Sequence, residues 1–345
     1  MYSTRVSIRD VARHAGVSPI TVSNVLHQRI GKFSDETRQR VRQALQELNY
    51  IPVRSAIQNR HVETHTIGVV FVFVQDMLLT VGYRTFKGMC DRCRQRDYNL
   101  TVILRSAPNW LAPETEAQYL DRRCDGYIFV GQNRPELSKF LISQQLPVVE
   151  CYSVDPPPGV VRVLPDSAAA SRIAVEFLAK RGHSRIAHLA GPHGHLEAEL
   201  RRQAFQDTMR AQGNNAFADC IIQGDSWGRD FTKERPMPEI RPLTDAVLAT
   251  GATAVVCAND PLALDLWQAA EEKGLRVPED ISILGMDNTE QGDYQGLTTI
   301  DFDFEAIGGA AVDALIAVKQ GADYLEASRV MPVTLVERRS VQRYV

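Results

Sequence analysis

The segment from residue 18 to residue 27, SPITVSNVLH, gathers side chains suited to recognising a polar partner. Val22 and Val25 share one face at helical spacing, and we expect that face to be buried. The side chains left for solvent or a partner are Ile20, Thr21, Ser23, Asn24 and His27. Hydroxyl groups donate hydrogen bonds without bulk, which suits phosphate oxygens, and an amide can make two bonds to one partner. The pattern therefore predicts a recognition surface.

Residues that could hold a metal or act in catalysis form no complete set in the sequence. Cys90 and Cys93 make one CxxC without a second pair, and we interpret both as reduced thiols. His193 and His195 in GPHGH, with His183 and His188 nearby, have no carboxylate at a ligand spacing, which favours loop histidines in solvent. The sequence also lacks a G-x-S-x-G elbow, a P-loop and a G-x-G-x-x-G. We expect no catalytic residue, no metal and no cofactor, with an enzyme as the main competing class.

Two short helices are expected to position the segment that begins at Ser18. Ser7 can cap the first, IRDVARHA, with Asp10 reaching back in a capping box. Gly16 permits the sharp turn, because it adopts backbone conformations that a Cβ resists. Ser18 then caps the second helix, and Pro19 occupies its first position without losing a hydrogen bond.

A third helix and the charge of this region complete a DNA-binding unit. Ser34 caps the third helix, which we expect to bury Val41, Leu45 and Leu48. Two short helices joined by a glycine-containing turn form a helix-turn-helix, whose second helix lies in the major groove of DNA. Residues 1–62 carry a net charge of +6, whereas the rest of the chain carries −9. A basic head on an acidic body fits a head that meets a polyanion.

From residue 65 onward, short β-branched runs alternate with amphipathic helical stretches. The runs that we expect to be buried strands are HTIGVVFVFV, YNLTVILR, CDGYIFVG, LPVVECY, HSRIAHLAG, ATAVVCAND and ISILGMD. This alternation predicts parallel sheets with helices on both faces, and two such lobes place a ligand cleft at the carboxyl ends of the strands. The sequence has no apolar run of membrane-spanning length, and charges stand where a signal peptide needs an apolar stretch. We therefore expect a cytoplasmic protein with no membrane partner.

The stretch SIRDVARHAGVSPITVSNVL, followed by SDETRQRVRQALQELNYIP, resembles the DNA-binding head of the LacI/GalR repressors. The resemblance continues through nearly the whole chain and implies a periplasmic-binding-protein-like body. The fold class it implies is a small all-α helix-turn-helix head plus an α/β body of two parallel-sheet lobes. The implied boundaries are 1–50 for the head, 51–64 for a hinge, 65–163 with 297–324 for lobe 1, and 164–296 with 325–345 for lobe 2. Crossover strands are expected near residues 163, 296 and 325.

The resemblance also assigns DNA contacts to the second helix. By this resemblance the phosphates are approached by Thr21, Ser23 and His27, with Ser18 at the helix start, and base edges are read by Pro19, Ile20 and Asn24. Asn24 stands where many relatives have arginine, and asparagine pairs with adenine whereas arginine pairs with guanine. Apolar Pro19 and Ile20 favour contact with a thymine methyl group. We hypothesise that the half-site differs from the common operator of the family.

The hinge departs from the family pattern at one position. The resemblance places Ala56 at a position that faces the minor groove, and Asn59 where a leucine wedges into it. Apolar wedges replace lost base stacking, which asparagine does poorly, and Ile57 is the nearest large aliphatic residue. Two alternatives stay open: a hinge that still bends DNA, or a linker that bends it little.

In the family the effector lies between the lobes. The positions that match effector contacts are Asp76, Arg201, Trp227, Asn259 and Asp287. Carboxylates, amides and forked guanidinium groups make paired hydrogen bonds to neighbouring hydroxyls, and an aromatic ring such as Trp227 or Tyr83 can stack on a sugar face. The alternative for Asn259 is that it ends a turn, and for Asp287 that it caps the next segment.

The first lobe departs from its relatives at two further places. Val81 and Gly82 stand where the family has an aromatic pair, and Tyr152 and Ser153 where an Asp-Arg pair is frequent. The identity of the effector therefore cannot be carried over from a relative. A sugar or sugar-like metabolite is favoured, with a purine base or nucleoside as the alternative.

These features predict a sequence-specific transcription regulator, a repressor whose operator affinity is set by the small ligand. A homodimer would place two heads on a pseudo-palindromic double-stranded DNA site, and the ligand acts through its differential affinity for two states. The chain ends soon after its last expected strand, which favours a dimer over a tetramer. A periplasmic transport receptor is a further alternative, and the DNA-binding head argues against it.

Overall fold

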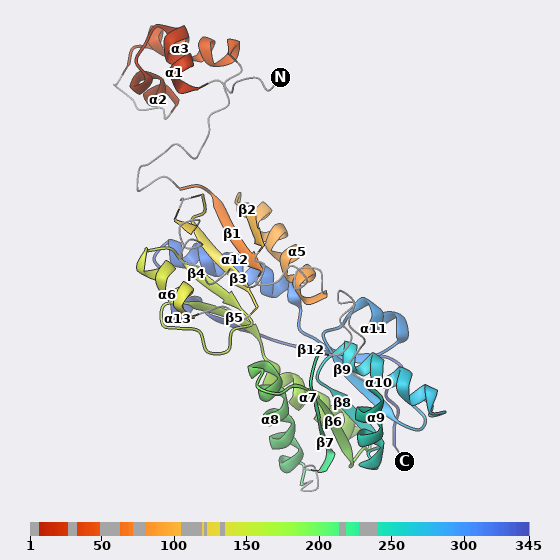
Figure 1. Ribbon diagram of the computed structural model, residues 1–345. Helices are drawn as coiled ribbons and strands as arrows, with labels where there is room; N and C mark the ends of the chain where they lie inside the picture. Colours follow the sequence, from red (N-terminus) through yellow and green to blue (C-terminus); the bar gives the residue numbers. More distant parts are fainter. Residues whose placement is uncertain are drawn as a thin grey trace. The chain divides into compact units, whose positions relative to one another are not determined.

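The computed structural model describes residues 7–26, 33–48, 63–71, 80–104, 119–120, 123–131, 135–213, 219–227 and 240–344. The chain divides into two units, residues 1–62 and residues 63–345 (Figure 1). Four residues assigned a role above, His27, Ala56, Asn59 and Asp76, lie outside the described residues, as does the hinge from 51 to 62.

The described residues of the first unit form three helices around a core of their own: α1 Ile8–Ala15, α2 Pro19–Leu26 and α3 Asp35–Glu47. The predicted caps are confirmed, including the capping box of Ser7 with Asp10 and the left-handed Gly16 at φ 64°. In α3 the structure corrects one expectation, because Ala44 is buried with Val41. Leu45 and Leu48 are only partly buried, since they pack at the rim of this small core.

The second unit holds two six-stranded sheets in its described residues. The first has the order β11-β5-β4-β3-β1-β2, with β1 Thr66–Phe71, β2 Asn99–Leu104, β3 Gly126–Val130, β4 Val148–Cys151, β5 Val161–Pro165 and β11 Arg329–Met331. The second has the order β12-β10-β9-β8-β6-β7, with β6 Ile186–Pro192, β7 Ile221–Gly224, β8 Ala254–Cys257, β9 Ser282–Met286, β10 Thr298–Asp301 and β12 Thr334–Val336. Neighbouring strands are parallel, except that β12 runs antiparallel to β10. The predicted parallel sheets are therefore confirmed.

Helices cover the sheets, as Figure 1 shows. Those of the first lobe are α5 Thr80–Gln95, α6 Pro135–Ser143, α12 Phe304–Lys319 and α13 Tyr324–Ala327. Those of the second lobe are α7 Ser167–Lys180, α8 Leu196–Ala211, α9 Ile240–Ala249, α10 Asp260–Glu272 and α11 Glu290–Gln295. Strands β3, β8 and β9 are buried along their whole length, which is why their sequences read as continuous apolar runs. No helix in the described ranges combines the length and apolar character needed to cross a membrane.

The chain passes between the two sheets at three places. The first lies between β5 and α7, close to the expected residue 163. The second follows β10, which belongs to the second sheet, and the third lies between β11 and β12. The expected crossovers at 296 and 325 were therefore a few residues too early. The strands TTID and RVM are too short for their sequence pattern to show which sheet they join.

In each sheet the chain adds strands first toward one edge and then toward the other. The place where this direction changes is a topological switch point, and in the first sheet it lies between β1 and β3. In the second sheet this point lies between β6 and β8. Ligands of open α/β sheets bind outside the carboxyl ends of the strands at such a point. The loops after β6, β8 and β9 are therefore where a ligand site is expected in the second lobe.

Candidate functional site

Helix α2 presents a short, uncovered surface held by a buried face. Val22 and Val25 lie in the core of the head, whereas the side chain of Ile20 is 73% exposed. The Ser18 hydroxyl accepts a hydrogen bond from the Thr21 backbone N–H at 3.1 Å and fixes the start of the helix. Pro19 is also exposed. An exposed β-branched side chain at the first turn of such a helix is placed for apolar contact with a base edge.

In the second lobe, six side chains gather at the switch point, and we call them the Arg201 cluster. Its members are Ser167, His195, Glu197, Arg201, Trp227 and Asp287. They come from α7, α8 and the loops that follow β6, β7 and β9. Three of the five predicted effector residues, Arg201, Trp227 and Asp287, thus belong to one group.

Arg201 is the centre of this cluster and is buried. Its Nη1 donates to the Ala258 carbonyl at 2.5 Å, and its Nε lies 3.4 Å from the Ser167 hydroxyl. The guanidinium carbon lies 4.7 Å from the centre of the Phe302 ring and 5.4 Å from that of Trp227. A guanidinium held against two aromatic rings has its remaining N–H donors fixed in direction, which suits recognition of a polar ligand.

Asn259 has a local role as a helix cap, which differs from the turn end that the sequence offered as its alternative. It caps α10, because its Oδ1 accepts from the Leu262 N–H at 3.0 Å. Its Nδ2 donates to the Trp227 carbonyl at 2.8 Å. Asn259 therefore positions Trp227, whatever contact it makes with a ligand.

Asp287 follows β9 and is both buried and conformationally restrained. Its φ of 113° lies in the left-handed region, which costs energy in a residue with a Cβ. No hydrogen bond within the described part of the chain reaches its carboxylate. The pKa of Asp287 is raised to about 8, chiefly by burial. Arg201 and Arg84 oppose the rise, and the charges of Asp260 and Asp301 contribute to it.

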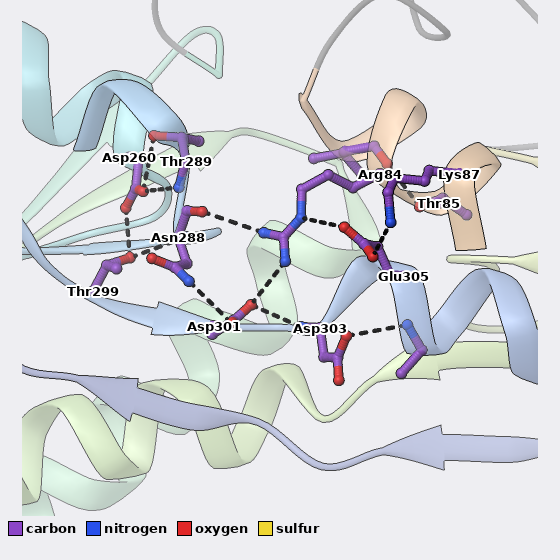
Figure 2. A network of polar contacts seen from close by, with 12 residues as sticks. Arg84, Thr85, Lys87, Asp260, Asn288, Thr289, Thr299, Asp301, Asp303 and Glu305 are labelled. Atoms are coloured by element: carbon purple, nitrogen blue, oxygen red, sulfur yellow. Dashed lines mark hydrogen bonds and ion pairs between the residues drawn. The ribbon is translucent and has the colours of Figure 1, made fainter. Parts of the chain in front are cut away.

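The segment after Asp287 is held from both lobes, as Figure 2 shows. Arg84, on α5 of the first lobe, donates to the Asn288 carbonyl at 3.2 Å. The Asn288 amide donates to Asp301 at 3.0 Å, and the Thr289 N–H donates to the buried Asp260 at 2.8 Å. Burial raises the pKa of Asp260 to about 6, although hydrogen bonds from its threonine neighbours oppose this.

Tyr152, in the first lobe, lies close to the Arg201 cluster. It directly follows β4 and lies in the left-handed region at φ 68°, and its hydroxyl oxygen lies 2.5 Å from that of Thr85. Burial raises its pKa, and the charges of Asp287 and Glu197 raise it further. The residue that replaces the frequent Asp-Arg pair is therefore near the carboxylates of the second lobe.

Sequence reasoning missed Glu197, Ser167 and His195. Glu197 lies one helical turn before Arg201, so the i, i+4 spacing could have placed both on one face of α8. The expectation of solvent-exposed loop histidines holds for His193 and is wrong for His195, which is half-buried. It is also wrong for His183 and for His188, which are buried, the latter within β6. The ring of His195 packs edge-on against that of Trp227, with 4.9 Å between the ring centres. Gly191 leaves room for the indole, because a Cβ there would clash with it.

Other predicted residues lie away from the cluster. Tyr83 is 56% exposed on α5, where its ring faces solvent. Cys90 is exposed and Cys93 buried, and burial raises the pKa of Cys93 to about 12. Over the described ranges, no three His, Cys, Asp or Glu side chains are grouped to hold a metal ion. A hollow of about 630 Å³ beside Ile186 and Cys220 shares no residue with the cluster.

Comparison with known proteins agrees with this architecture. Residues 7–53 match the family described as bacterial regulatory proteins, lacI family, and residues 175–341 match a periplasmic binding protein-like domain. The lactose operon repressor of Escherichia coli strain K12 is 30% identical over 357 residues, which cover 97% of this chain and 90% of that protein. The chain belongs to the lacI family.

Further members of the lacI family and their structures are similar over the same length. The ribose operon repressor of E. coli K12 is 29% identical over 324 residues, 90% of this chain and 92% of that repressor. A crystal structure of the lac repressor dimer bound to operator and the anti-inducer ONPF matches with a TM-score of 0.77 and 29% identity. It covers 98% of this chain and all of the other. The similarity to the lac repressor therefore extends over both units of the chain.

Proposed function

We propose that this chain is a transcriptional repressor that binds operator DNA through α2 and responds to a small ligand at the Arg201 cluster. The observation that carries the proposal is the pairing of an exposed α2 surface with a buried polar cluster at a sheet switch point. The operator-bound lac repressor and the ribose operon repressor support it as relatives. Its target is chromosomal DNA, so it works in the cytoplasm and catalyses no reaction.

The DNA contacts divide between base edges and phosphates. Pro19, Ile20 and Asn24 read bases, and the exposed Ile20 side chain contacts a thymine methyl group. The hydroxyl side chains set the register on the phosphates. The proposed phosphate and groove contacts are Ser18, Thr21, Ser23, His27, Ala56 and Asn59.

The effector is a polyhydroxylated metabolite held by the second lobe and enclosed by the first. Arg201 and Asp287 bind its hydroxyl groups, and Trp227, positioned by Asn259, provides an aromatic face. Asp76 would contribute from the first lobe. Sugar-operon repressors among the relatives favour a carbohydrate over a nucleoside.

A homodimer places one head on each half-site. The lac repressor dimer is the precedent. Half-sites one helical turn apart then mirror the two-fold symmetry of the protein.

Selection of bound sites from random DNA, at two salt concentrations, tests this function. We expect an enriched pseudo-palindrome whose binding weakens steeply with salt.

Two variants of α2 test the base contacts. Asn24→Arg should shift one position of the selected site from adenine toward guanine, and Ile20→Ala should lower the affinity for the site about tenfold by removing an apolar base contact. Leu325→Ala, an exposed leucine of the body, is the control that leaves binding unchanged. No enriched sequence, or a monomer on the selected site, contradicts the proposal.

A further inference from the structure

Glu197 holds a carboxylate oxygen that the protein itself does not satisfy. The residue stands in the first turn of α8, and only 5% of it is exposed. Its Oε2 accepts a hydrogen bond from the Ser167 hydroxyl. Its Oε1 is buried and has no hydrogen-bond partner among the described residues. A carboxylate buried in this way costs several kcal/mol unless a donor or a cation meets it.

The nearest cation is already engaged elsewhere. Arg201, one turn along the same helix, donates to Ala258 and Ser167 and lies against two aromatic rings. Within the described ranges, no ion pair of 4 Å or less joins Arg201 to Glu197 or to Asp287. The guanidinium therefore leaves the Oε1 of Glu197 for another donor.

Among the described residues, Glu197 is the buried carboxylate of the cluster that has no cation beside it. The pKa of Asp287 is raised to about 8, so Asp287 is mostly protonated at neutral pH and needs no cation there. The Nδ1 of His195 also lacks a partner in the described residues, and burial lowers the pKa of this histidine, so that it is uncharged at neutral pH. The hydroxyl of Tyr152 adds no charge from the first lobe. A ligand ammonium would give the Oε1 of Glu197 a charge-assisted hydrogen bond, whereas an anionic group at the same place would be repelled by the carboxylate.

We propose that Glu197 determines effector specificity by accepting a hydrogen bond from an amino group of the ligand, so that the effector is an amino-bearing polyol such as an amino sugar. The inference rests on the proposed function, because it takes the Arg201 cluster as the ligand site. Arg201 and Asp287 bind the hydroxyl groups, and Glu197 pairs with the ammonium. A phosphate or carboxylate beside Glu197 would be repelled, so we do not expect phosphorylated or carboxylated sugars to be effectors.

Calorimetric titration of the full chain with matched sugars tests the ligand class. The probes are glucosamine, galactosamine and mannosamine, their parent hexoses, their N-acetyl derivatives and the hexose 6-phosphates. We expect at least one amino sugar to bind tenfold or more tightly than its parent hexose and its N-acetyl derivative. Equal binding of the parent hexose, tighter binding of a phosphate, or no binding of any amino sugar overturns the inference.

Two variants assign the effect to Glu197. Glu197→Gln should remove the preference for the amine, because it keeps the size of the side chain and loses its charge. Glu199→Gln is the matched control two residues away, where the carboxylate pairs with Arg202 on the surface of the same helix, and it should retain the preference. A preference that survives Glu197→Gln excludes this residue as its source.

A second measurement requires no ligand. Removing an unsatisfied buried charge should raise the melting temperature of the ligand-free Glu197→Gln variant by about 2–6 °C. Glu199→Gln should not raise it. A lower melting temperature for Glu197→Gln shows that the carboxylate is satisfied within the protein, and the inference then fails.

The two proposals fail in different ways. If no operator is selected, the proposed function fails, whatever sugars bind. If an operator is selected but amino sugars are not preferred, only the assignment of Glu197 and its ligand class fails.

Discussion

Asp287 combines a left-handed backbone with a buried acidic side chain. The sequence placed this residue at the end of a strand and offered two roles for it, in the pocket or as a cap. Its backbone geometry could not be predicted, because an Asp-Asn pair after a strand is compatible with several turns. Strained residues of this kind persist where surrounding contacts hold them, and here Arg84, Asp301 and Asp260 hold the next two residues.

Asp287→Asn should change the pH dependence of stability. The fold raises the pKa of Asp287 to about 8 from 3.8. Between these two values the folded chain keeps a proton that the unfolded chain loses, so the free energy of unfolding is highest below about pH 4 and falls until the pH passes 8. Asparagine resembles the protonated acid and lacks that decline. The variant should melt close to the wild type at pH 4 and several degrees higher at pH 8.5.

Thermal melts at half-unit pH intervals measure this difference. Asp207→Asn, an exposed carboxylate on α8, should give a small difference that stays constant with pH. If the melting temperatures of Asp287→Asn and the wild type differ by the same amount at pH 4 and at pH 8.5, the raised pKa of Asp287 is contradicted.

At the scale of elements, the beginning of β1 is fixed by a single carboxylate. Asp125 accepts from the Thr64 N–H at 2.7 Å and from the His65 N–H at 3.0 Å. Lys319, at the end of α12, donates to the same carboxylate at 2.7 Å. Burial alone would raise the pKa of Asp125, but these donors hold it below its ordinary value. The chain thus enters the body through a buried ion pair.

Asp125→Asn should loosen this entry point. Loss of the charge leaves Lys319 without its closest partner and weakens two backbone hydrogen bonds, so the amides of Thr64 and His65 should exchange hydrogen at least tenfold faster. Hydrogen exchange followed by mass spectrometry measures the change. Asp313→Asn removes an α12 carboxylate that pairs with Arg92 and should leave these amides unchanged. Equal exchange in Asp125→Asn and the wild type contradicts an anchoring role.

The strands that the sequence revealed are those buried on both faces. β3, β8 and β9 read as continuous apolar runs and were predicted. β7 was missed, because this edge strand, IIQG, is only partly buried along most of its length and carries a polar residue. Short edge strands owe their position to a neighbouring strand, which a local pattern does not contain.

At the scale of the whole molecule, Arg84 connects the two lobes near the crossovers. Besides the Asn288 carbonyl, its guanidinium lies within 3.8 Å of Asp301 and 3.9 Å of Glu305 (Figure 2). Two lobes were predictable from the alternation of strands and helices. This bridge was not, because its hydrogen bond joins the Arg84 guanidinium to a backbone carbonyl 204 positions away, and no local sequence motif links the two.

Arg84→Met should favour separation of the lobes. Methionine keeps the apolar part of the side chain and loses charge-assisted bonds worth about 1–3 kcal/mol, which shifts an equilibrium between closed and open lobes roughly tenfold or more. The radius of gyration of the ligand-free chain in solution scattering should rise. Arg92→Met breaks a pair with Asp313 inside the first lobe and should not change it. An unchanged radius in Arg84→Met shows that the bridge does not hold the lobes.

The three passages between sheets also fix the order in which the molecule can be completed during synthesis. α12, which packs on α5, comes from residues 304–319, and the edge strand β11 ends at Met331. The first lobe therefore cannot be completed until nearly the whole chain has been synthesised, although its first strand is made early. The head has its own core in residues 8–48 and can fold as soon as it leaves the ribosome. A polypeptide cut short before Met331 thus retains the DNA-reading helix and contains neither lobe in finished form.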